Sequence, residues 1–378
     1  MDQLVLDTNQ IVETDWYLRS AAIRLVEKAV HLGLISIVVP EIVFEEACNK
    51  FRHKLHKHLK GAHDLNTKIS KLIDSEFETP TLRIEDACKK YAEYLDARLK
   101  ELKASLPAYG GIDHKWLLAK AFGPRRPFHE GDRGYRDSLV WYAVVHDVAS
   151  PKHQTYFVSA NKKDFGDQKD GLHPDLIVDL KEAGIEGHVT HMHDLQVFVD
   201  NVIKPTLEKV PSPLTVEKFG ELFEANLDSI IAELSGAIEK QGLPGLPSEL
   251  FESSPYIEQL GLVSVELGEA YKLDDTSYYT SFEVEVEASF DQTVFGPDAI
   301  WIADTWGMSI TGGDEKLTDL SFTLTIPLTI VVVTNTAHDV EYEFSVELQD
   351  FYGFCRHCGT PVITDAAEAC SACGQPLF

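Results

Sequence analysis

The sequence has no apolar run of the 18 or more residues that a membrane-spanning helix needs, so we expect no transmembrane segment. Its first residues lack a basic stretch followed by an apolar core, which predicts a cytoplasmic protein without a secretion signal. Basic residues are scarce: 34 Lys and Arg stand against 61 Asp and Glu, a net charge of −27. Cysteine is rare too, and four of the six cysteines form two CxxC pairs near residue 378, which favours a metal site over a disulfide framework.

The charge is unevenly distributed along the 378 residues. Residues 1–200 hold 27 Lys and Arg against 31 Asp and Glu, whereas residues 201–378 hold 7 against 30. Within the first part, residues 51–136 hold 18 basic against 12 acidic residues, and such a basic region is where a phosphate backbone could dock. The C-terminal half would repel nucleic acid, so we expect it to serve another purpose.

Short apolar runs alternate with helical patterns over the first 200 residues, which predicts βαβ units and a parallel sheet. Residues 107–134, rich in Gly and Pro, are expected to be a loop, and Asp137 should open the helix that follows. The predicted strands are Leu4–Leu6, Ile35–Val39, Thr155–Ser159 and His188–His191. The predicted helices include Trp16–Leu32, Ile42–Leu59 and a long stretch over 61–105.

A change of character follows residue 205. Thr215–Ile238 is expected to be helical, and the Gly, Pro and Ser cluster at 242–255 to be a linker. Beyond it, Tyr279–Phe290 alternates apolar and acidic residues, as a half-buried strand does, and Leu320–Val333 and Val340–Leu348 are also strand-like. We therefore expect four regions: an α/β domain at 1–205, a helical segment and linker at 206–255, an acidic antiparallel β domain at 256–350, and a cysteine-bearing module at 351–378.

Acidic residues occupy the positions that a metal-dependent phosphodiesterase would need. Asp7 ends the first strand, Glu45 or Glu46 lies in the first turns of the helix after the second strand, and Asp137 lies at a helix start. Asp164 follows the third strand. The carboxyl ends of parallel strands share one edge of the sheet, so these acids can converge there on one or two Mg²⁺ or Mn²⁺ ions.

Four sequence blocks carry a resemblance to a known family. In chain order they are LVLDTN, VVPEIVFEEA, GYRDSLVW and FVSANKKDFG, with LHPDL after the last. Over roughly residues 1–200 they resemble the PIN-domain nucleases, and within these a bacterial PIN-like branch of unassigned function. The resemblance implies a parallel sheet flanked by helices and a metal-dependent endoribonuclease activity.

Transferred by position, the metal ligands of that family fall on Asp7, Glu46, Asp137 and Asp164. The choice of Glu46 over Glu45 rests on its spacing from Pro40. Ser159 matches a hydroxyl that orients the site, and Asn9 is expected to lie behind the ligands. Many PIN domains have an acid where this chain has Asn161, so either Asn161 or Asp164, or both, would complete the site.

The two CxxC pairs predict a second, separate metal site. Cys355 and Cys358 are followed by Gly359, Cys370 and Cys373 by Gly374, and eleven residues separate the pairs. Such knuckles bind one Zn²⁺ tetrahedrally, and four protein ligands leave no open position, so the zinc should be structural. The segment resembles a short zinc ribbon.

These patterns together predict a nuclease that hydrolyses phosphodiester bonds in RNA, with DNA as the other candidate substrate. The basic residues expected to steer the nucleic-acid backbone are Lys50, Arg52, Lys54, Arg125 and Arg126. The acidic β domain or the zinc ribbon would bind a protein partner or regulate the nuclease. Two alternatives fit the same sequence features: a non-catalytic PIN scaffold for protein interaction, and a DNA-directed defence nuclease.

Overall fold

The computed structural model describes all residues except 13–14, 74–81, 124, 130–132, 167–170, 248–249, 251–254, 307, 314–315, 336–339, 341–343, 350, 356–357, 363–368 and 376–378. The chain divides into two compact units, Met1–Leu207 and Glu208–Phe378, and each is described by itself. None of the described helices combines the length and the apolar character needed to cross a membrane.

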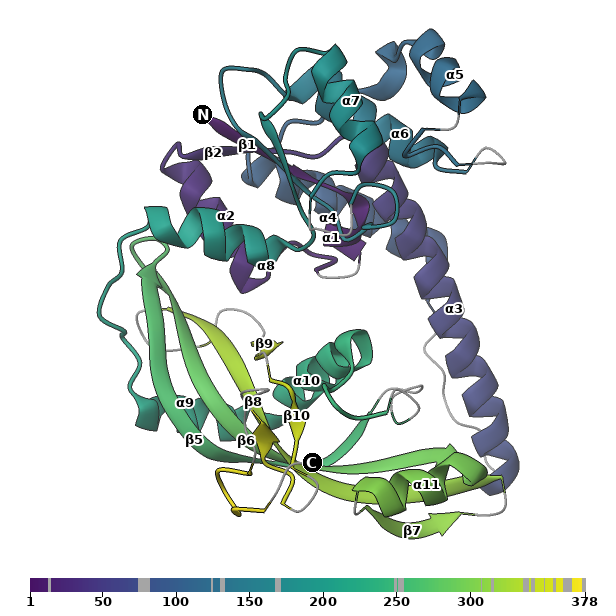
Figure 1. The fold of residues 1–378 in the computed structure, drawn as a ribbon, viewed down its shortest axis with the longest axis vertical. Helices are drawn as coiled ribbons and strands as arrows, with labels where there is room; N and C mark the ends of the chain where they lie inside the picture. The colour runs from purple at the N-terminus through teal and green to yellow at the C-terminus, as the bar shows by residue number, and fades with distance from the viewer. Residues whose placement is uncertain are drawn as a thin grey trace. The chain divides into compact units, whose positions relative to one another are not determined.

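A four-stranded parallel sheet forms the centre of the first unit (Figure 1). Its strands are β1 (Asp2–Leu6), β2 (Ile35–Val38), β3 (Thr155–Val158) and β4 (Val189–Met192), in the order β2-β1-β3-β4. Leu4, Val5 and Leu6 have no exposed surface because β1 is central and covered on both faces. The predicted parallel sheet flanked by helices is confirmed.

The helices of the first unit connect these strands in sequence. They are α1 (Thr8–Val12), α2 (Ala21–His31), α3 (Glu41–Ile73), α4 (Ile84–Glu101), η1 (Tyr109–Gly111), α5 (His114–Phe122), α6 (Tyr135–Tyr142), η2 (Ala143–Val148), α7 (Pro174–Glu182), α8 (Leu195–Phe198), η3 (Val199–Ile203) and η4 (Lys204–Thr206).

Helix boundaries differ from the sequence expectation where capping residues set them. Helix α2 begins at Ala21 instead of Trp16, because the Ser20 side chain caps it by accepting a bond from the Ile23 amide. The expected loop at 107–134 contains α5, whose first turn is capped by Asp113. The expected single stretch over 61–105 is divided between the end of α3 and α4.

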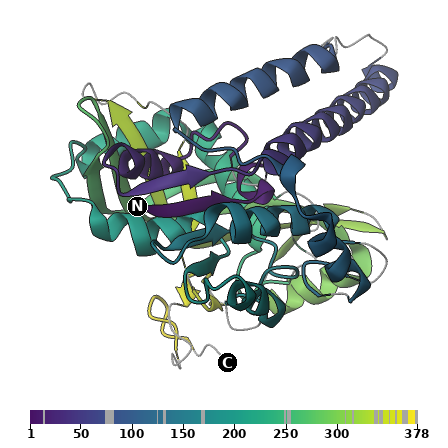
Figure 2. The same ribbon diagram turned by 90° about the horizontal axis from the view of Figure 1, so that it is seen from above.

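Helices α3 and α4 run side by side and extend away from the sheet (Figure 2). An aromatic cluster holds them together near the sheet. The rings of Phe51 on α3 and Tyr91 on α4 stack with centroids 4.1 Å apart, and Trp16 meets both edge-on. Aromatic packing of this kind fixes the two helices against each other where they leave the domain.

The second unit is an antiparallel sheet packed against helices (Figure 1). Its strands run in the order β5-β6-β8-β7, with β9 also paired to β8, which confirms the antiparallel β-rich region. Its elements are α9 (Val216–Ala225), α10 (Leu227–Gln241), β5 (Tyr256–Lys272), β6 (Ser277–Phe295), α11 (Gly296–Trp306), β7 (Ser309–Gly313), β8 (Leu317–Asn335), β9 (Ser345–Leu348), β10 (Gly353–Phe354) and β11 (Pro361–Val362).

One apolar core joins the helices and the sheet of the second unit. Phe219 of α9 stacks on Phe282 of β6 with ring centroids 4.1 Å apart, and Ile230 of α10 belongs to the same buried cluster. The expected helix at Thr215–Ile238 is two helices that meet at Asn226. The expected linker at 242–255 lies partly outside the described residues; within it Leu250 is buried in this core.

A buried ion pair anchors α5 to α7 in the first unit. The Lys120 ammonium lies 2.5 Å from Asp179 Oδ2, and both side chains are 1% exposed. Trp141 donates its indole N–H to the same oxygen at 2.8 Å, and Lys120 also donates to the carbonyl of Arg126 at 3.3 Å. Burial lowers the pKa of Lys120 against the opposing effect of Asp179. The pair therefore ties three helices to the segment around Arg126.

We expect Lys120→Met to destabilise the first unit by about 3–5 kcal/mol, because it leaves a buried carboxylate without its counter-charge. The double variant Lys120→Met/Asp179→Asn removes that charge and keeps an acceptor for Trp141, so it should recover most of the loss. Urea unfolding of the full chain, followed by tryptophan fluorescence, measures both. A single variant as stable as the unaltered chain would contradict the role given to the pair.

Candidate active site

Asp7 lies at the carboxyl edge of the sheet, directly after β1, and is 6% exposed. Three donors surround its carboxylate. The backbone N–H of Thr8 donates to Oδ1 at 2.7 Å. The Ser159 hydroxyl and the side-chain amide of Asn9 donate to Oδ2 at 2.6 Å and 2.9 Å. Hydrogen bonds on both oxygens hold the carboxylate in a single orientation.

Ser159 reaches Asp7 because β1 and β3 are neighbouring parallel strands. Leu6 pairs with Val158, so the residues that follow these two positions emerge together at the same edge. Asn9 reinforces the contact by accepting a bond from the amide of Ala160 at 3.1 Å. The structure thus brings Asn9 and Ser159 to Asp7, as the sequence predicts for side chains that support a ligand.

Glu46 and Glu45 point to different surroundings. Glu46 Oε2 accepts a bond from the Thr8 hydroxyl at 3.1 Å, next to Asp7, and its Oε1 lies 2.7 Å from Arg136. Glu45 instead accepts a bond from the Tyr109 hydroxyl at 2.8 Å. Adjacent helical residues are turned by about 100° from one another, so only one of the two can face Asp7. That residue is Glu46.

Asp137 lies in the first turn of α6, and Asn161 connects it to Asp164. The side-chain amide of Asn161 donates to Asp137 Oδ1 at 3.2 Å and to Asp164 Oδ2 at 2.7 Å. Its side-chain oxygen Oδ1 accepts a bond from the backbone N–H of Asp164 at 3.2 Å. Asn161 therefore bridges the two acids. Its own backbone N–H donates to the Ser159 hydroxyl at 3.1 Å, which links it to Asp7.

Gly134 directly precedes α6 as its N-cap residue, and only glycine fits there. Its φ is +89°, and a Cβ on it would come within 1.9 Å of the carbonyl oxygen of Pro127. This close approach packs the segment that carries Arg126 and His129 against the start of the helix that carries Asp137.

Arg126 and His129 both contact the fourth acid. The His129 ring nitrogen Nε2 is hydrogen-bonded to Asp164 Oδ1, and Arg126 Nη1 lies 3.5 Å from the same oxygen. The sequence predicts Arg126 as a nucleic-acid contact and carries no signal that predicts His129. A cavity of about 180 Å³ opens beside Asp164 and is lined by His129, Arg133, Gly134 and Lys163. It presents basic groups next to the acids.

Burial and mutual repulsion make the acids electrostatically unusual. Burial raises the pKa of Asp7 to about 6, and the carboxylates of Asp137 and Glu46 add to the rise, against the bonds from Ser159 and Thr8. Burial also raises the pKa of Asp137, with repulsion from Asp164 and Glu46 in the same direction. A cation would relieve this repulsion.

The donor set suits a hard divalent cation, because Mg²⁺ and Mn²⁺ prefer carboxylate oxygens. In the described part of the chain, only the four cysteines bring three or more metal-ligating atoms close enough together to hold an ion directly. The carboxylates instead meet through Thr8, Ser159 and Asn161. Mg²⁺ keeps several of its waters when bound, so ligands separated in this way still fit it.

The other four basic residues that the sequence predicts to contact nucleic acid differ in their surroundings. Lys50 Nζ lies 3.6 Å from Glu46, and Lys54 lies over the ring of Trp16. Arg52 is exposed on α3, and Arg125 lies 3.8 Å from Glu182 on α7. Of the five basic residues predicted to contact nucleic acid, Lys50 and Arg126 are the two with an ion pair to one of the four acids in the described part of the chain.

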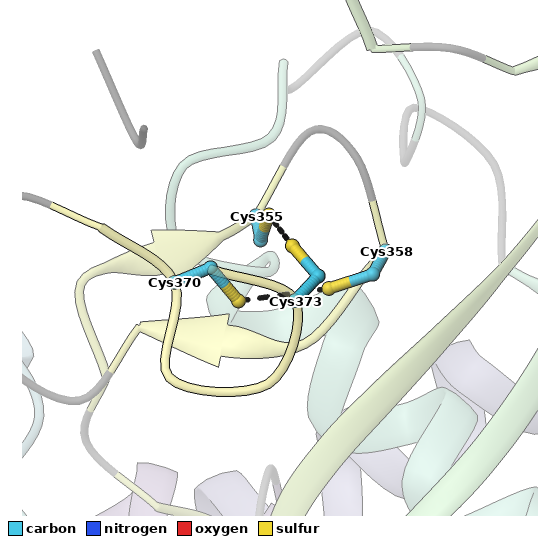
Figure 3. A group of neighbouring side chains, drawn as sticks. All are labelled: Cys355, Cys358, Cys370 and Cys373. Carbon is cyan, nitrogen blue, oxygen red and sulfur yellow. Dashed lines mark hydrogen bonds between the residues drawn. The ribbon is translucent and has the colours of Figure 1, made fainter. Parts of the chain in front are cut away.

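The four cysteines form a compact cluster in the second unit (Figure 3). Their sulfur atoms lie within 4.8 Å of one another, with 3.7 Å between Cys355 and Cys373 and 3.6 Å between Cys358 and Cys370. A tetrahedron of thiolates at the Zn–S distance of about 2.3 Å has edges of about 3.8 Å, whereas a disulfide requires about 2.05 Å. The cluster could bind zinc.

Both knuckles have the same backbone hydrogen bond. Gly359 donates to the carbonyl of Cys355, and Gly374 to the carbonyl of Cys370, each at 2.9 Å. Gly359 has φ +69°, and a Cβ on it would come 2.8 Å from the carbonyl oxygen of Thr323 on β8. The first knuckle therefore packs directly on the sheet.

A comparison with protein families finds a match within the first unit. The family model described as PIN domain matches residues 4–165. This range contains Asp7, Glu46, Asp137 and Asp164, together with strands β1 to β3. No significant match exists among curated proteins or solved structures.

Asp7→Asn tests, in metal-free buffer, how much the ionised carboxylate of buried Asp7 destabilises the fold. An aspartate with an ordinary pKa of 3.8 when unfolded and about 6 when folded stabilises the fold most at low pH and loses that contribution as the pH rises through 6. We expect Asp7→Asn to gain up to about 3 kcal/mol relative to the unaltered chain between pH 4 and 7. Urea unfolding with EDTA measures the difference, and Asp96→Asn on α4 is the control. A pH-independent difference would contradict the assignment.

Proposed function

Residues 4–165 of this chain match the family model described as PIN domain, and on that premise we propose that the protein is a Mg²⁺- or Mn²⁺-dependent endonuclease that hydrolyses phosphodiester bonds in RNA. The observation that carries the proposal is the meeting of four acids from four separate elements at one edge of the sheet. They are Asp7 after β1, Glu46 on α3, Asp137 on α6 and Asp164 after β3. PIN domains are generally nucleases, and this arrangement supports that activity here.

When bound, one or two divalent cations would activate water and neutralise charge on the phosphate. The chain's own side chains hold the ligands in place. Ser159 and Asn9 fix the carboxylate of Asp7, and Thr8 orients Glu46. Asn161 bridges Asp137 and Asp164 by donating to both, so we propose Asp164 as the ligand and Asn161 as the residue that positions it.

Basic side chains near the acids would hold the negatively charged backbone. Lys50 and Arg126 lie at the cluster, and Arg52, Lys54 and Arg125 lie farther out on the same unit. Nucleic-acid affinity arises mainly from such phosphate contacts, which position the strand without reading its sequence.

The second unit is proposed to bind a protein partner or to regulate the nuclease. Glu283, Glu285 and Glu287 alternate with buried residues along β6, so they form an acidic row on one face of the sheet. Such a face repels nucleic acid and favours a basic partner. The zinc, bound by Cys355, Cys358, Cys370 and Cys373, would be structural, and thiolate ligands of this kind agree with a reducing cytoplasmic location.

The adjacent glutamates provide a matched pair for testing the nuclease. We expect Glu46→Gln to lower Mn²⁺-dependent cleavage of labelled single-stranded RNA by at least about 100-fold, because it removes one of few charged ligands. Glu45→Gln, one residue away and bonded to Tyr109, should cleave normally. Asp7→Asn/Asp137→Asn should abolish cleavage.

The same assay separates the competing functions. Labelled DNA is run beside RNA, and calorimetry measures Mn²⁺ binding to each variant. Cleavage of DNA alone would make the protein a DNA nuclease. No cleavage, together with no Mn²⁺ binding that depends on Asp7 and Asp137, would leave a PIN scaffold for protein interaction.

Cys358→Ser tests the zinc site. The full chain purified without chelators should contain one zinc per molecule by mass spectrometry, since four thiolates saturate one tetrahedral ion. We expect Cys358→Ser to lose most of that zinc. Cys48→Ser, at a cysteine outside the cluster, should retain it. Equal zinc content in both variants would rule out the cluster as the ligand set.

A further inference from the structure

Six lysines share one face of α3 with Glu46. Each residue turns the helix by about 100°, so Lys50, Lys54, Lys57, Lys60, Lys68 and Lys71 fall within an arc of about 120° that includes Glu46. The contact of Lys50 with Glu46 at 3.6 Å, four residues apart, agrees with this phase. We call these six residues the lysine track.

The opposite face of α3 is the one that α4 covers. Phe51 stacks on Tyr91 of α4, and Leu55, Leu59 and Ile69, which lie on the same side as Phe51, are half-buried. The five lysines of the track beyond Lys50 are exposed. Helix α4 and the apolar side of α3 therefore leave the lysine track facing solvent, along the part of α3 that extends from the sheet (Figure 2).

The track concentrates positive charge in a chain of net charge −27. From Lys50 to Lys71 the sequence has seven Lys and Arg and a single acid, Asp64. Within the described part of the chain, the pair of Lys50 with Glu46 is the only ion pair made by a lysine of the track. A row of cations with so few counter-charges is suited to a polyanion.

The dimensions fit an extended phosphate backbone. From Lys50 to Lys71 the helix rises by 1.5 Å per residue, which is about 30 Å. At a spacing of about 3.4 Å per nucleotide along a duplex strand, this corresponds to about nine nucleotides. The track begins at Lys50, one helical turn after Glu46, and runs away from the four acids.

We propose that the lysine track binds the phosphate backbone of the nucleic acid outside the cleavage position, so that the protein prefers substrates long enough to lie along α3. The inference rests on the proposed nuclease function, because that function makes nucleic acid the occupant. It adds a requirement for substrate length that the four acids alone do not impose.

The test removes four charges without altering the apolar face of α3. The full-length variant Lys57→Gln/Lys60→Gln/Lys68→Gln/Lys71→Gln is compared with the unaltered chain, both in an Asp137→Asn background. Its matched control, which lowers the charge equally, is Lys89→Gln/Lys90→Gln/Lys152→Gln/Lys181→Gln, at lysines exposed elsewhere on the first unit. Circular dichroism checks that each variant is folded.

Fluorescence anisotropy with single-stranded RNA measures binding over a range of salt. Each phosphate contact contributes about 0.7 to the slope of log affinity against log salt, so the track variant should lose up to about 3 from that slope on a strand of about 20 nucleotides. The loss should be small on a strand of about 5 nucleotides, too short to reach along α3. Equal slopes for the track variant, the control and the unaltered chain would overturn the proposal.

Asp64→Lys provides a change of opposite sign. Asp64 lies four residues from both Lys60 and Lys68, on the same face, and its carboxylate repels a passing phosphate. We expect this variant to bind the long strand more tightly and to steepen its salt dependence. Weaker or unchanged binding would count against the track.

The outcomes separate this inference from the proposed function. An unaltered chain that binds RNA through the track but cleaves nothing in Mn²⁺ would retain the track and reject the nuclease. Cleavage by the unaltered chain, with salt slopes unaffected in the track variant, would retain the nuclease and reject the track. Sedimentation velocity tests the other possible occupant of the track, which is an acidic face of a second copy of the chain. Self-association that is lost only in the track variant, while RNA binding is unchanged, would also reject the proposal that the track binds nucleic acid.

Discussion

The parallel pairing of β1 with β3 is the constraint on which the candidate site depends. It places Asp7 and Ser159, 152 residues apart in the chain, at one sheet edge with 2.6 Å between hydroxyl and carboxylate. Asn9, the second residue of α1, donates to the same carboxylate, and Asn161, two residues beyond Ser159, donates its backbone N–H to the Ser159 hydroxyl. A register shift of one residue would turn these side chains to the other face and disperse the acids. The strand register therefore determines the site before any loop contributes to it.

The second support is the buried pair of Lys120 and Asp179, which holds the segment from Arg126 to Gly134. Lys120 donates to the carbonyl of Arg126, and Asp175 on α7 accepts a bond from the Arg126 amide at 3.0 Å. The close approach of Gly134 to Pro127 fixes the far end. These contacts at Arg126 and at Gly134 hold Arg126 and His129 in place beside Asp164.

Much of this could be predicted from the sequence because strands buried on both faces are short apolar runs, and residues at their ends share an edge. The choice between Glu45 and Glu46 could not be settled that way, since it depends on the phase of α3, which its first turn sets. His129 was not predicted because its contact with Asp164 spans 35 residues of chain and depends on a loop. Helix α5 was missed because its sequence, HKWLLAKAF, carries only a weak amphipathic pattern and is flanked by Gly and Pro residues.

The end of the chain shows the same dependence on a neighbouring strand. Residues 351–378 are too few to bury a core of their own, and segments of this size are usually held by metals or disulfides. Here the two-stranded β10–β11 ribbon lies beside β8, and the Thr325 amide donates to the carbonyl of Gly359 at 3.3 Å. Gly359 is required at this point both by its positive φ and by the nearness of Thr323. The knuckle is thus shaped partly by β8, so a metal at the cysteines would join a site whose geometry the sheet already constrains.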